Sequence, residues 1–163
     1  MKKVMIVDDN YLAAEGIEKN IAWSDLDAEV SIIQHNSRSA LDAMKNSPVD
    51  LIISDIEMPD LDGISMCKLA LALNPMVKII LVSAYDKFEY AKRAIRLGAY
   101  DYIEKPLDYS YLTEKIKNAF AQLDRIRKNQ ELLKASRPLM TDKFLTTCFN
   151  FRGKTLQPGL VLS

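Results

Sequence analysis

Residues 77–82 read Val77-Lys78-Ile79-Ile80-Leu81-Val82, a short run in which most side chains are apolar and β-branched. Its length and composition indicate a β-strand, because helices in globular proteins are usually longer. The run Leu51-Ile52-Ile53, which precedes Asp55, has the same character. Successive apolar positions are typical of strands that are covered by helices on both faces. These two runs therefore predict the centre of a parallel sheet.

Further strands and helices alternate on either side of these two runs. Additional strands are predicted at residues 4–7, 28–34 and 100–103, the second of them weaker. Segments of helical period lie between the strands, at residues 11–22, 39–46, 62–73 and 88–97, the last closed by Gly98. Strands that alternate with helices imply right-handed crossover connections. The predicted fold class is α/β, with a doubly wound five-stranded parallel sheet.

The last predicted helix, at residues 110–135, is longer than such a domain needs. Its seam follows the heptad spacing of helix–helix contacts, with one polar interruption. The seam consists of Leu112, Ile116, Ala119, Leu123, Ile126, Gln130 and Leu133. We expect the first half to pack against the domain, while the second half is either a solvated helix or a seam for a partner helix. Arg137-Pro138 is expected to end this extended C-terminal helix.

Composition excludes several classes of function. The chain has 22 Lys and Arg and 22 Asp and Glu, so no global positive charge is available to hold nucleic acid. Its two cysteines and single histidine are too few for a Cys/His zinc site. The apolar run after Lys2-Lys3 is too short for a signal peptide, and no stretch is long enough to span a membrane. We therefore expect a cytoplasmic protein without a membrane association.

Polar residues follow four of the predicted strands. Asp8 and Asp9 follow the first strand, Asp55 the third, Ser83 the fourth and Lys105 the fifth. Ligands of open parallel sheets bind at the carboxyl ends of the strands. A lone Asp in such a place is usually a solvated loop residue, but four clusters at one edge are hard to explain in that way. The pattern predicts a functional site at this edge.

The residue types suit phosphoryl transfer. Clustered carboxylates repel one another unless a cation is present, and oxygen ligands favour a hard ion such as Mg²⁺. The Asp55 carboxylate can act as a nucleophile toward phosphorus. Lys105 supplies a positive charge and Ser83 a hydroxyl donor for the phosphoryl oxygens. Reversible phosphorylation of Asp55 is therefore our hypothesis.

Five segments resemble the receiver domain of two-component response regulators. They are Val4-Met5-Ile6-Val7-Asp8-Asp9, Leu51-Ile52-Ile53-Ser54-Asp55-Ile56-Glu57-Met58-Pro59, Asp62-Gly63, Leu81-Val82-Ser83-Ala84 and Tyr102-Ile103-Glu104-Lys105-Pro106. The resemblance covers about residues 1–125, in order and with normal spacing. It implies a flavodoxin-like sheet of order 2-1-3-4-5 and a cis bond between Lys105 and Pro106.

The resemblance also implies roles for individual residues. Asp55 would be the phosphoacceptor, and Mg²⁺, with Mn²⁺ as an alternative, would be bound by Asp9, Asp55 and the main-chain carbonyl of Glu57. Asp8 would act on the metal largely through water. Ser83 and Lys105 would contact the phosphoryl group, and Tyr102 would reorient together with Ser83 as an aromatic switch. Glu57 and Tyr85 flank the path of an attacking water, so we expect that they either modulate the lifetime of the phosphoryl group or are exposed loop residues without such a role.

A second stretch narrows the resemblance to one subgroup. Residues Ser83-Ala84-Tyr85-Asp86-Lys87-Phe88-Glu89-Tyr90-Ala91, followed by Leu97-Gly98-Ala99, are similar to regulators that carry an AraC-type DNA-binding domain. The resemblance implies a sensor histidine kinase as phosphoryl donor. It also implies a homodimer formed through the C-terminal helix or through the output face, the surface of the predicted helix at 88–97, the strand at 100–103 and the last helix. DNA would be bound only through a C-terminal domain that this sequence lacks. We assign a receiver domain to 1–125, a helical linker to 126–137 and the start of a further region to 138–163.

Two alternative interpretations compete with this one. Asp55-Ile56-Glu57 has the Asp-x-acid form of the nucleophile motif in haloacid-dehalogenase-type phosphatases, but those enzymes place it after the first strand. A pseudo-receiver, which would act as an interaction module without phosphorylation, is expected to lack one of the key residues, whereas all are present here. We therefore expect a signalling domain rather than an enzyme. The basic cluster of Lys92, Arg93 and Arg96 is either part of the output face or a solvated helix face.

Overall fold

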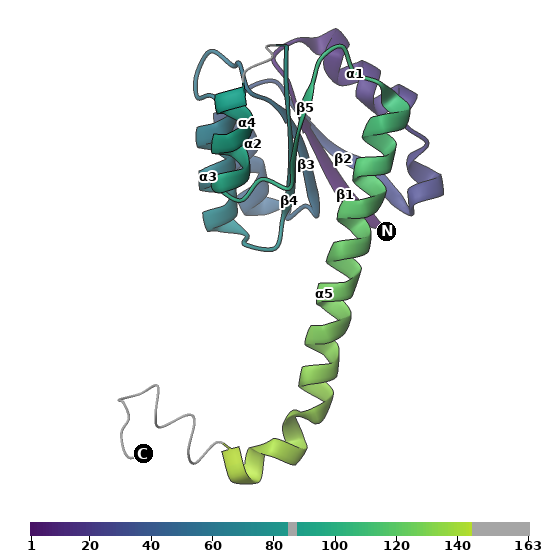
Figure 1. The fold of residues 1–163 in the computed structure, drawn as a ribbon, viewed down its shortest axis with the longest axis vertical. Helices are drawn as coiled ribbons and strands as arrows, with labels where there is room; N and C mark the ends of the chain where they lie inside the picture. Colours follow the sequence, from purple (N-terminus) through teal and green to yellow (C-terminus); the bar gives the residue numbers. More distant parts are fainter. Residues whose placement is uncertain (85–87, 145–163) are drawn as a thin grey trace. The chain divides into compact units, whose positions relative to one another are not determined.

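The computed structural model describes residues 1–84 and 88–144, with side-chain surroundings given for all of these except 88 and 135–144. Five strands alternate with five α-helices (Figure 1). The strands are β1 (Lys2–Val7), β2 (Ala28–Gln34), β3 (Leu51–Asp55), β4 (Lys78–Ser83) and β5 (Asp101–Glu104). The helices are α1 (Tyr11–Asn20), α2 (Ser37–Asn46), α3 (Gly63–Leu73), α4 (Phe88–Arg96) and α5 (Tyr109–Phe144), with a short 3₁₀ helix η1 (Trp23–Leu26) after α1.

The strands form one parallel sheet of order β2-β1-β3-β4-β5, which confirms the predicted fold class and strand order. Helices cover both faces, α1 and the first part of α5 on one and α2, α3 and α4 on the other (Figure 1). Alternate residues of each strand enter the two cores. Met5 and Ile52 face α2, α3 and α4, whereas Val4 and Ile53 face α1 and α5. Two buried faces explain why the strands are apolar at successive positions.

The helices begin where a polar side chain can cap them. Asn10 accepts hydrogen bonds from the backbone N–H groups of Leu12 and Ala13 at the start of α1. Asn36 caps α2 and Asp62 caps α3 in the same manner. Because each cap follows closely after a strand end, these capping residues also shape the loops at the carboxyl edge of the sheet.

The predicted seam on α5 has two different halves. Leu112, Ile116, Ala119 and Leu123 are completely buried, as expected for its first half. Leu133 lies on the same seam and is 65% exposed, and its neighbour Leu132 is 60% exposed. The seam positions are equally spaced in both halves, and a single polar residue, Gln130, interrupts the second half. Periodicity alone therefore could not show which half is buried.

The predicted helix end at Arg137-Pro138 is wrong, because α5 continues through Pro138 to Phe144. A proline removes one backbone hydrogen bond and can kink a helix without ending it. The chain divides into two compact units, Met1–Ala121 and a second that begins at Gln122. Among the described helices, none is long and apolar enough to cross a membrane.

Candidate functional site

The register of the sheet brings the predicted polar residues to one edge. Val7 pairs with Ser54 across β1 and β3, and Asp55 pairs with Val82 across β3 and β4. The ladder continues beyond the strands, since Lys105 N–H donates to the carbonyl oxygen of Ser83 at 2.7 Å. Neighbouring strands thus end at the same level. This places Asp8, Asp55, Ser83 and Lys105 side by side in the order β1, β3, β4 and β5.

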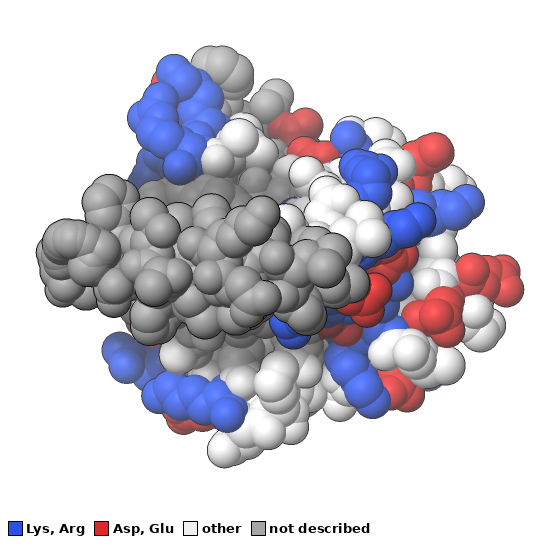
Figure 2. Space-filling model, turned by 90° about the horizontal axis from the view of Figure 1, so that it is seen from below, with Lys and Arg blue, Asp and Glu red and all other residues white. Residues whose placement is uncertain are grey.

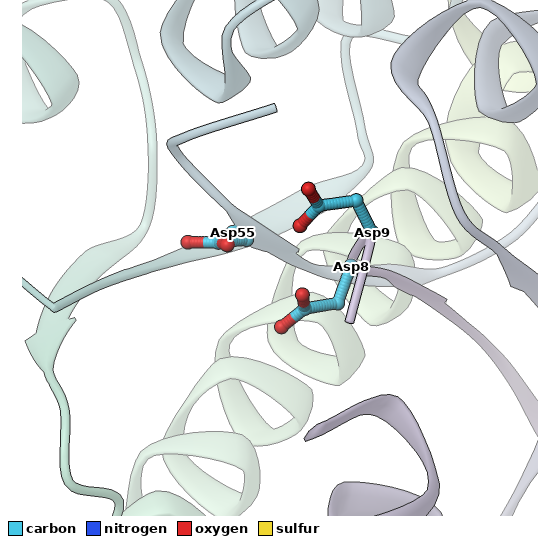
Figure 3. Close-up of side chains that lie close together, drawn as sticks. All are labelled: Asp8, Asp9 and Asp55. Atoms are coloured by element: carbon cyan, nitrogen blue, oxygen red, sulfur yellow. The ribbon is translucent and has the colours of Figure 1, made fainter. Parts of the chain in front are cut away.

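Three carboxylates converge at this edge. Oxygen atoms of Asp8, Asp9 and Asp55 all lie within 4.8 Å of one another (Figure 3). Asp8 and Asp55 are 2% and 8% exposed, whereas Asp9 is open to solvent. Like charges at this separation repel strongly when they are shielded from water. The cluster therefore needs positive charge.

Lys105 provides part of that charge from the end of β5. Its Nζ lies 3.2 Å from Asp8 Oδ2 and 3.7 Å from Asp55 Oδ2. The peptide bond between Lys105 and Pro106 is cis, which confirms the expectation from the resemblance. One ammonium group balances only part of the charge of three carboxylates.

Asp55 shows the remaining imbalance most clearly. Burial, and then the charge of Asp8, raise the pKa of Asp55 from its ordinary value of 3.8 to about 6, although Lys105 opposes the shift. Its Oδ1 atom is buried and has no hydrogen-bond partner among the described residues. A buried carboxylate oxygen without a donor is costly unless a cation or another group binds it.

These residues fit a hard divalent cation. The ligands are carboxylate oxygens, there is no Cys or His in the cluster, and one oxygen is unpaired and buried. Mg²⁺ prefers such oxygen ligands and retains several waters, for which the exposed Asp9 leaves access.

Ser83 and Glu57 contact each other next to the acid cluster. The Ser83 hydroxyl is fully buried and donates to the Glu57 carboxylate, 3.1 Å from Oε2 and 3.4 Å from Oε1. Tyr102, the predicted switch residue, lies on β5 opposite Leu81 and packs against the core on the α4 side. Tyr85 lies outside the described residues, so its predicted role is not tested.

The loop that follows Asp55 is braced by residues that the sequence did not single out. The Asp60 carboxylate accepts hydrogen bonds from the N–H groups of Ser37 and Arg38 at the start of α2. These bonds lower the pKa of Asp60. The Ser37 hydroxyl donates to the carbonyl oxygen of Leu61 at 2.6 Å. The sequence indicates Asn36-Ser37 as residues that can begin a helix, but only the tertiary structure shows which loop the start of α2 contacts.

Gly63 closes the same loop against the end of β3. Its N–H donates to the carbonyl oxygen of Ile56 at 2.7 Å. A Cβ atom at this position would lie 2.3 Å from the carbonyl oxygen of Asp55 and 2.8 Å from Cα of Ile56. Only glycine permits this approach.

His35, at the end of β2, contacts a residue of the site. Its Nδ1 lies 2.9 Å from the carbonyl oxygen of Asp8, and its ring stacks on Tyr11 with centroids 3.6 Å apart. Tyr11 itself is 68% exposed. The pair therefore supports the main chain of Asp8 from the β2 side.

Two of the three residues in the basic cluster of α4 line a groove. Arg93 and Arg96 are exposed and line a groove with Lys68 of α3. Where described residues are visible in Figure 2, Lys and Arg are interspersed with Asp and Glu over much of the surface. On that face the described residues form no continuous basic surface of the kind that nucleic acids require.

Comparisons with known proteins agree with this geometry. The model of the "Response regulator receiver domain" family matches residues 4–117. The uncharacterized transcriptional regulatory protein YesN of Bacillus subtilis is 29% identical over 125 residues, which are 77% of this chain and 34% of that protein. ZraR of Escherichia coli, a transcriptional regulatory protein, is 32% identical over 68% of this chain and 25% of its own length. The chain thus spans about a third or less of these two relatives.

Two solved structures are similar over most of the chain. The receiver domain of AraT, a response regulator from Geobacillus stearothermophilus, has a TM-score of 0.70 and 32% identity, and the match covers 79% of this chain and 98% of that one. A two-component transcriptional regulator AraC from Clostridium phytofermentans has a TM-score of 0.68 and 29% identity, with 80% and 99% covered.

Proposed function

This chain belongs to the response regulator receiver domain family, and we propose that it is switched by transfer of a phosphoryl group to Asp55. The observation that carries the proposal is the buried Oδ1 atom of Asp55, which has no hydrogen-bond partner in the described part of the chain. The Asp55 side chain lies next to Asp8, Asp9 and Lys105. A carboxylate that only stabilised the fold would be expected to have its oxygens paired.

A divalent cation completes the site in this proposal. Asp9, Asp55 and the main-chain carbonyl of Glu57 would hold Mg²⁺ or Mn²⁺, and Asp8 would act largely through a bound water. When bound, the cation supplies positive charge that balances the negative charge of the phosphoryl oxygens.

The reaction itself uses the side chain of Asp55. One carboxylate oxygen forms a bond to phosphorus, and the bond from phosphorus to the donor atom breaks. The donor atom is a phosphohistidine nitrogen in a sensor kinase or an oxygen in acetyl phosphate. Lys105 moves from its hydrogen bond with Asp8 and its ion pair with Asp55 to a phosphoryl oxygen. The Ser83 hydroxyl donates a hydrogen bond to a second phosphoryl oxygen, and Tyr102 reorients together with Ser83. This change shifts the population of conformers at the output face.

The time for which the signal lasts would depend on the residues near the phosphoryl group. We place Glu57 and Tyr85 beside the path of an attacking water, where their size and charge alter hydrolysis. A dephosphorylation time course of Glu57→Asn and Tyr85→Ala tests this role, and rates equal to that of the wild type would contradict it.

The output of the switch lies outside the described residues. Similarity to AraT and to the Clostridium regulator supports an AraC-type DNA-binding output, reached through a linker at residues 126–137 after a receiver domain at 1–125. Residues 138–163 would begin the following region. Dimer formation would use the output face or the C-terminal helix, with DNA bound only by the output domain.

Intact mass measurement tests the central proposal. After incubation with acetyl phosphate and Mg²⁺, the wild-type chain should gain the mass of one phosphoryl group, and Asp55→Ala should gain none. Omission of Mg²⁺, or addition of a chelator, should prevent the gain. An unchanged wild-type mass would instead favour the pseudo-receiver interpretation.

A further inference from the structure

In the proposed cycle, the Ser83 hydroxyl donates a hydrogen bond to two different acceptors in turn. In this structure it donates to the Glu57 carboxylate, at 3.1 Å from the nearer oxygen. In the phosphorylated protein it would donate to a phosphoryl oxygen. A hydroxyl group carries one hydrogen and therefore makes one donated bond at a time. The two contacts exclude each other.

We infer that Glu57 is a positioning residue that holds the Ser83 hydroxyl before phosphorylation and must release it for the phosphoryl group to be stabilised. This inference rests on the proposed function, because it concerns a step of the same reaction. It assigns to the Glu57 side chain a role in uptake of the phosphoryl group, separate from its main-chain carbonyl and from any effect on hydrolysis.

Burial and charge make the contact strong enough to matter. Ser83 is fully buried, so its hydroxyl gains little from water when the bond to Glu57 breaks. A hydrogen bond to a carboxylate is roughly twice as strong as one between neutral groups. Glu57 also adds negative charge near Asp55 and contributes to its raised pKa. Both effects oppose the arrival of an anionic phosphoryl group.

A cavity of about 440 Å³ gives the released carboxylate a place to go. Glu57 lines this cavity together with Arg93 of α4, and Asp9 lies on its wall as well. The Arg93 guanidinium is exposed and pairs with no acid in the described part of the chain. Movement of Glu57 toward Arg93 would thus replace the lost bond and link the acceptor site to α4.

The test is a double-mutant cycle on the rate of labelling by acetyl phosphate and Mg²⁺, followed by intact mass on the full chain. Glu57→Gln keeps the main-chain carbonyl and the size of the side chain, and it should label roughly five- to tenfold faster than the wild type. The same change in a Ser83→Ala background should have a clearly smaller effect, because no hydroxyl is left to release and only the charge of Glu57 is removed. Glu114→Gln, an exposed site on α5, is the matched control.

Each result bears on the inference. If Glu57→Gln accelerates labelling equally with and without Ser83, the effect is one of charge alone and the holding role is refuted. Labelling of Glu57→Gln at the wild-type rate also refutes it, while leaving the proposed function intact. If the wild type is not labelled at all, the proposed function fails and this inference fails with it. Urea unfolding of every variant verifies that it is folded.

A second experiment tests whether Arg93 pairs with the Glu57 carboxylate after its release from Ser83. Arg93→Gln should slow labelling roughly twofold in the wild-type background and leave Glu57→Gln unchanged. Arg96→Gln is the control, since Arg96 lines the neighbouring groove and not the cavity that contains Glu57. An equal effect of Arg93→Gln in both backgrounds would contradict a contact with Glu57.

Discussion

The charged residues at the two ends of the same strands differ in burial and in pairing. At the amino end, Lys3 and Glu29 form an ion pair whose side chains are 49% and 45% exposed, and Asp50 accepts the Lys3 N–H at 2.8 Å. At the carboxyl end, Asp8 and Asp55 are buried beside Asp9 with Lys105 as their partner. Charges at the first edge satisfy one another, while those at the second repel. The comparison teaches that the carboxyl edge is built at a cost in stability, as binding sites often are.

The largest loss of stability at the carboxyl edge is expected for a substitution at Gly63, where a Cβ atom would lie very close to the backbone of the neighbouring strand. Gly63→Ala would place Cβ 2.3 Å from the carbonyl oxygen of Asp55, and neither backbone can yield easily. We expect a loss of about 3 kcal/mol in the free energy of unfolding, measured by urea titration. Gly16→Ala is the comparison, since its Cβ would meet the end of a side chain, the Tyr109 hydroxyl. A milder loss, removed by Tyr109→Phe, is expected there.

Asp55→Asn should stabilise the metal-free protein. The shift of the Asp55 pKa from 3.8 to about 6 means that folding disfavours the charged carboxylate, by about 3 kcal/mol if the whole shift is counted. We expect a gain of about 2 kcal/mol at pH 8 in the presence of a chelator.

The sign of the pH dependence follows from the direction of the shift. Below pH 3.8 Asp55 is protonated in both states, and its contribution to stability is complete. That contribution is lost as the pH rises toward and through about 6. The advantage of Asp55→Asn should therefore shrink from pH 8 to pH 4 in urea titrations. An advantage that is constant over this range would contradict the raised pKa.

Addition of Mg²⁺ should remove part of the same cost. At ten times its dissociation constant, a ligand that binds only the folded state adds about 1.4 kcal/mol of stability. The melting temperature of the wild type should rise with Mg²⁺, while that of Asp9→Asn should rise much less. Equal responses of the two proteins would place the ion elsewhere.

The smallest effect is expected at the amino end. Glu29→Gln removes the exposed ion pair with Lys3, and such pairs are screened by water and salt. We expect a free energy of unfolding that is indistinguishable from that of the wild type. A clear loss of stability would show that the exposed ion pair at the amino end contributes to folding, which would contradict the stated difference between the two edges.

Much of the fold and part of the site could be predicted from local patterns. Strand β2 was predicted with its observed ends, and the other elements except α5 differ from their predicted bounds by a few residues, as β1 does by beginning at Lys2. Apolar runs and capping residues are local properties, so they are visible in the sequence. The meeting of Asp8, Asp55 and Lys105 could be expected because parallel strands end at a common edge.

The contacts that hold the site could not be predicted in this way. Asp60 braces α2 and Glu57 accepts the Ser83 hydroxyl through bonds between segments that are distant in sequence. Other acids in the chain have the same side-chain chemistry, so residue type alone does not indicate these partners. The Pro138 prediction was wrong because a local rule was applied to a helix whose flanking turns continue on both sides.

By itself, the sequence determined the α/β class, the order of its elements and the convergence of acids, hydroxyl and lysine at one edge. These follow from residue periodicity and from the chirality of parallel crossovers, which hold for any chain with this pattern. Only the tertiary structure decided that Asp55 has a buried, unpaired oxygen, that Glu57 holds Ser83 and that the seam of α5 is buried at Leu112 but exposed at Leu133. Burial and partner choice depend on which surfaces the packed elements cover, and that is a property of the assembled fold.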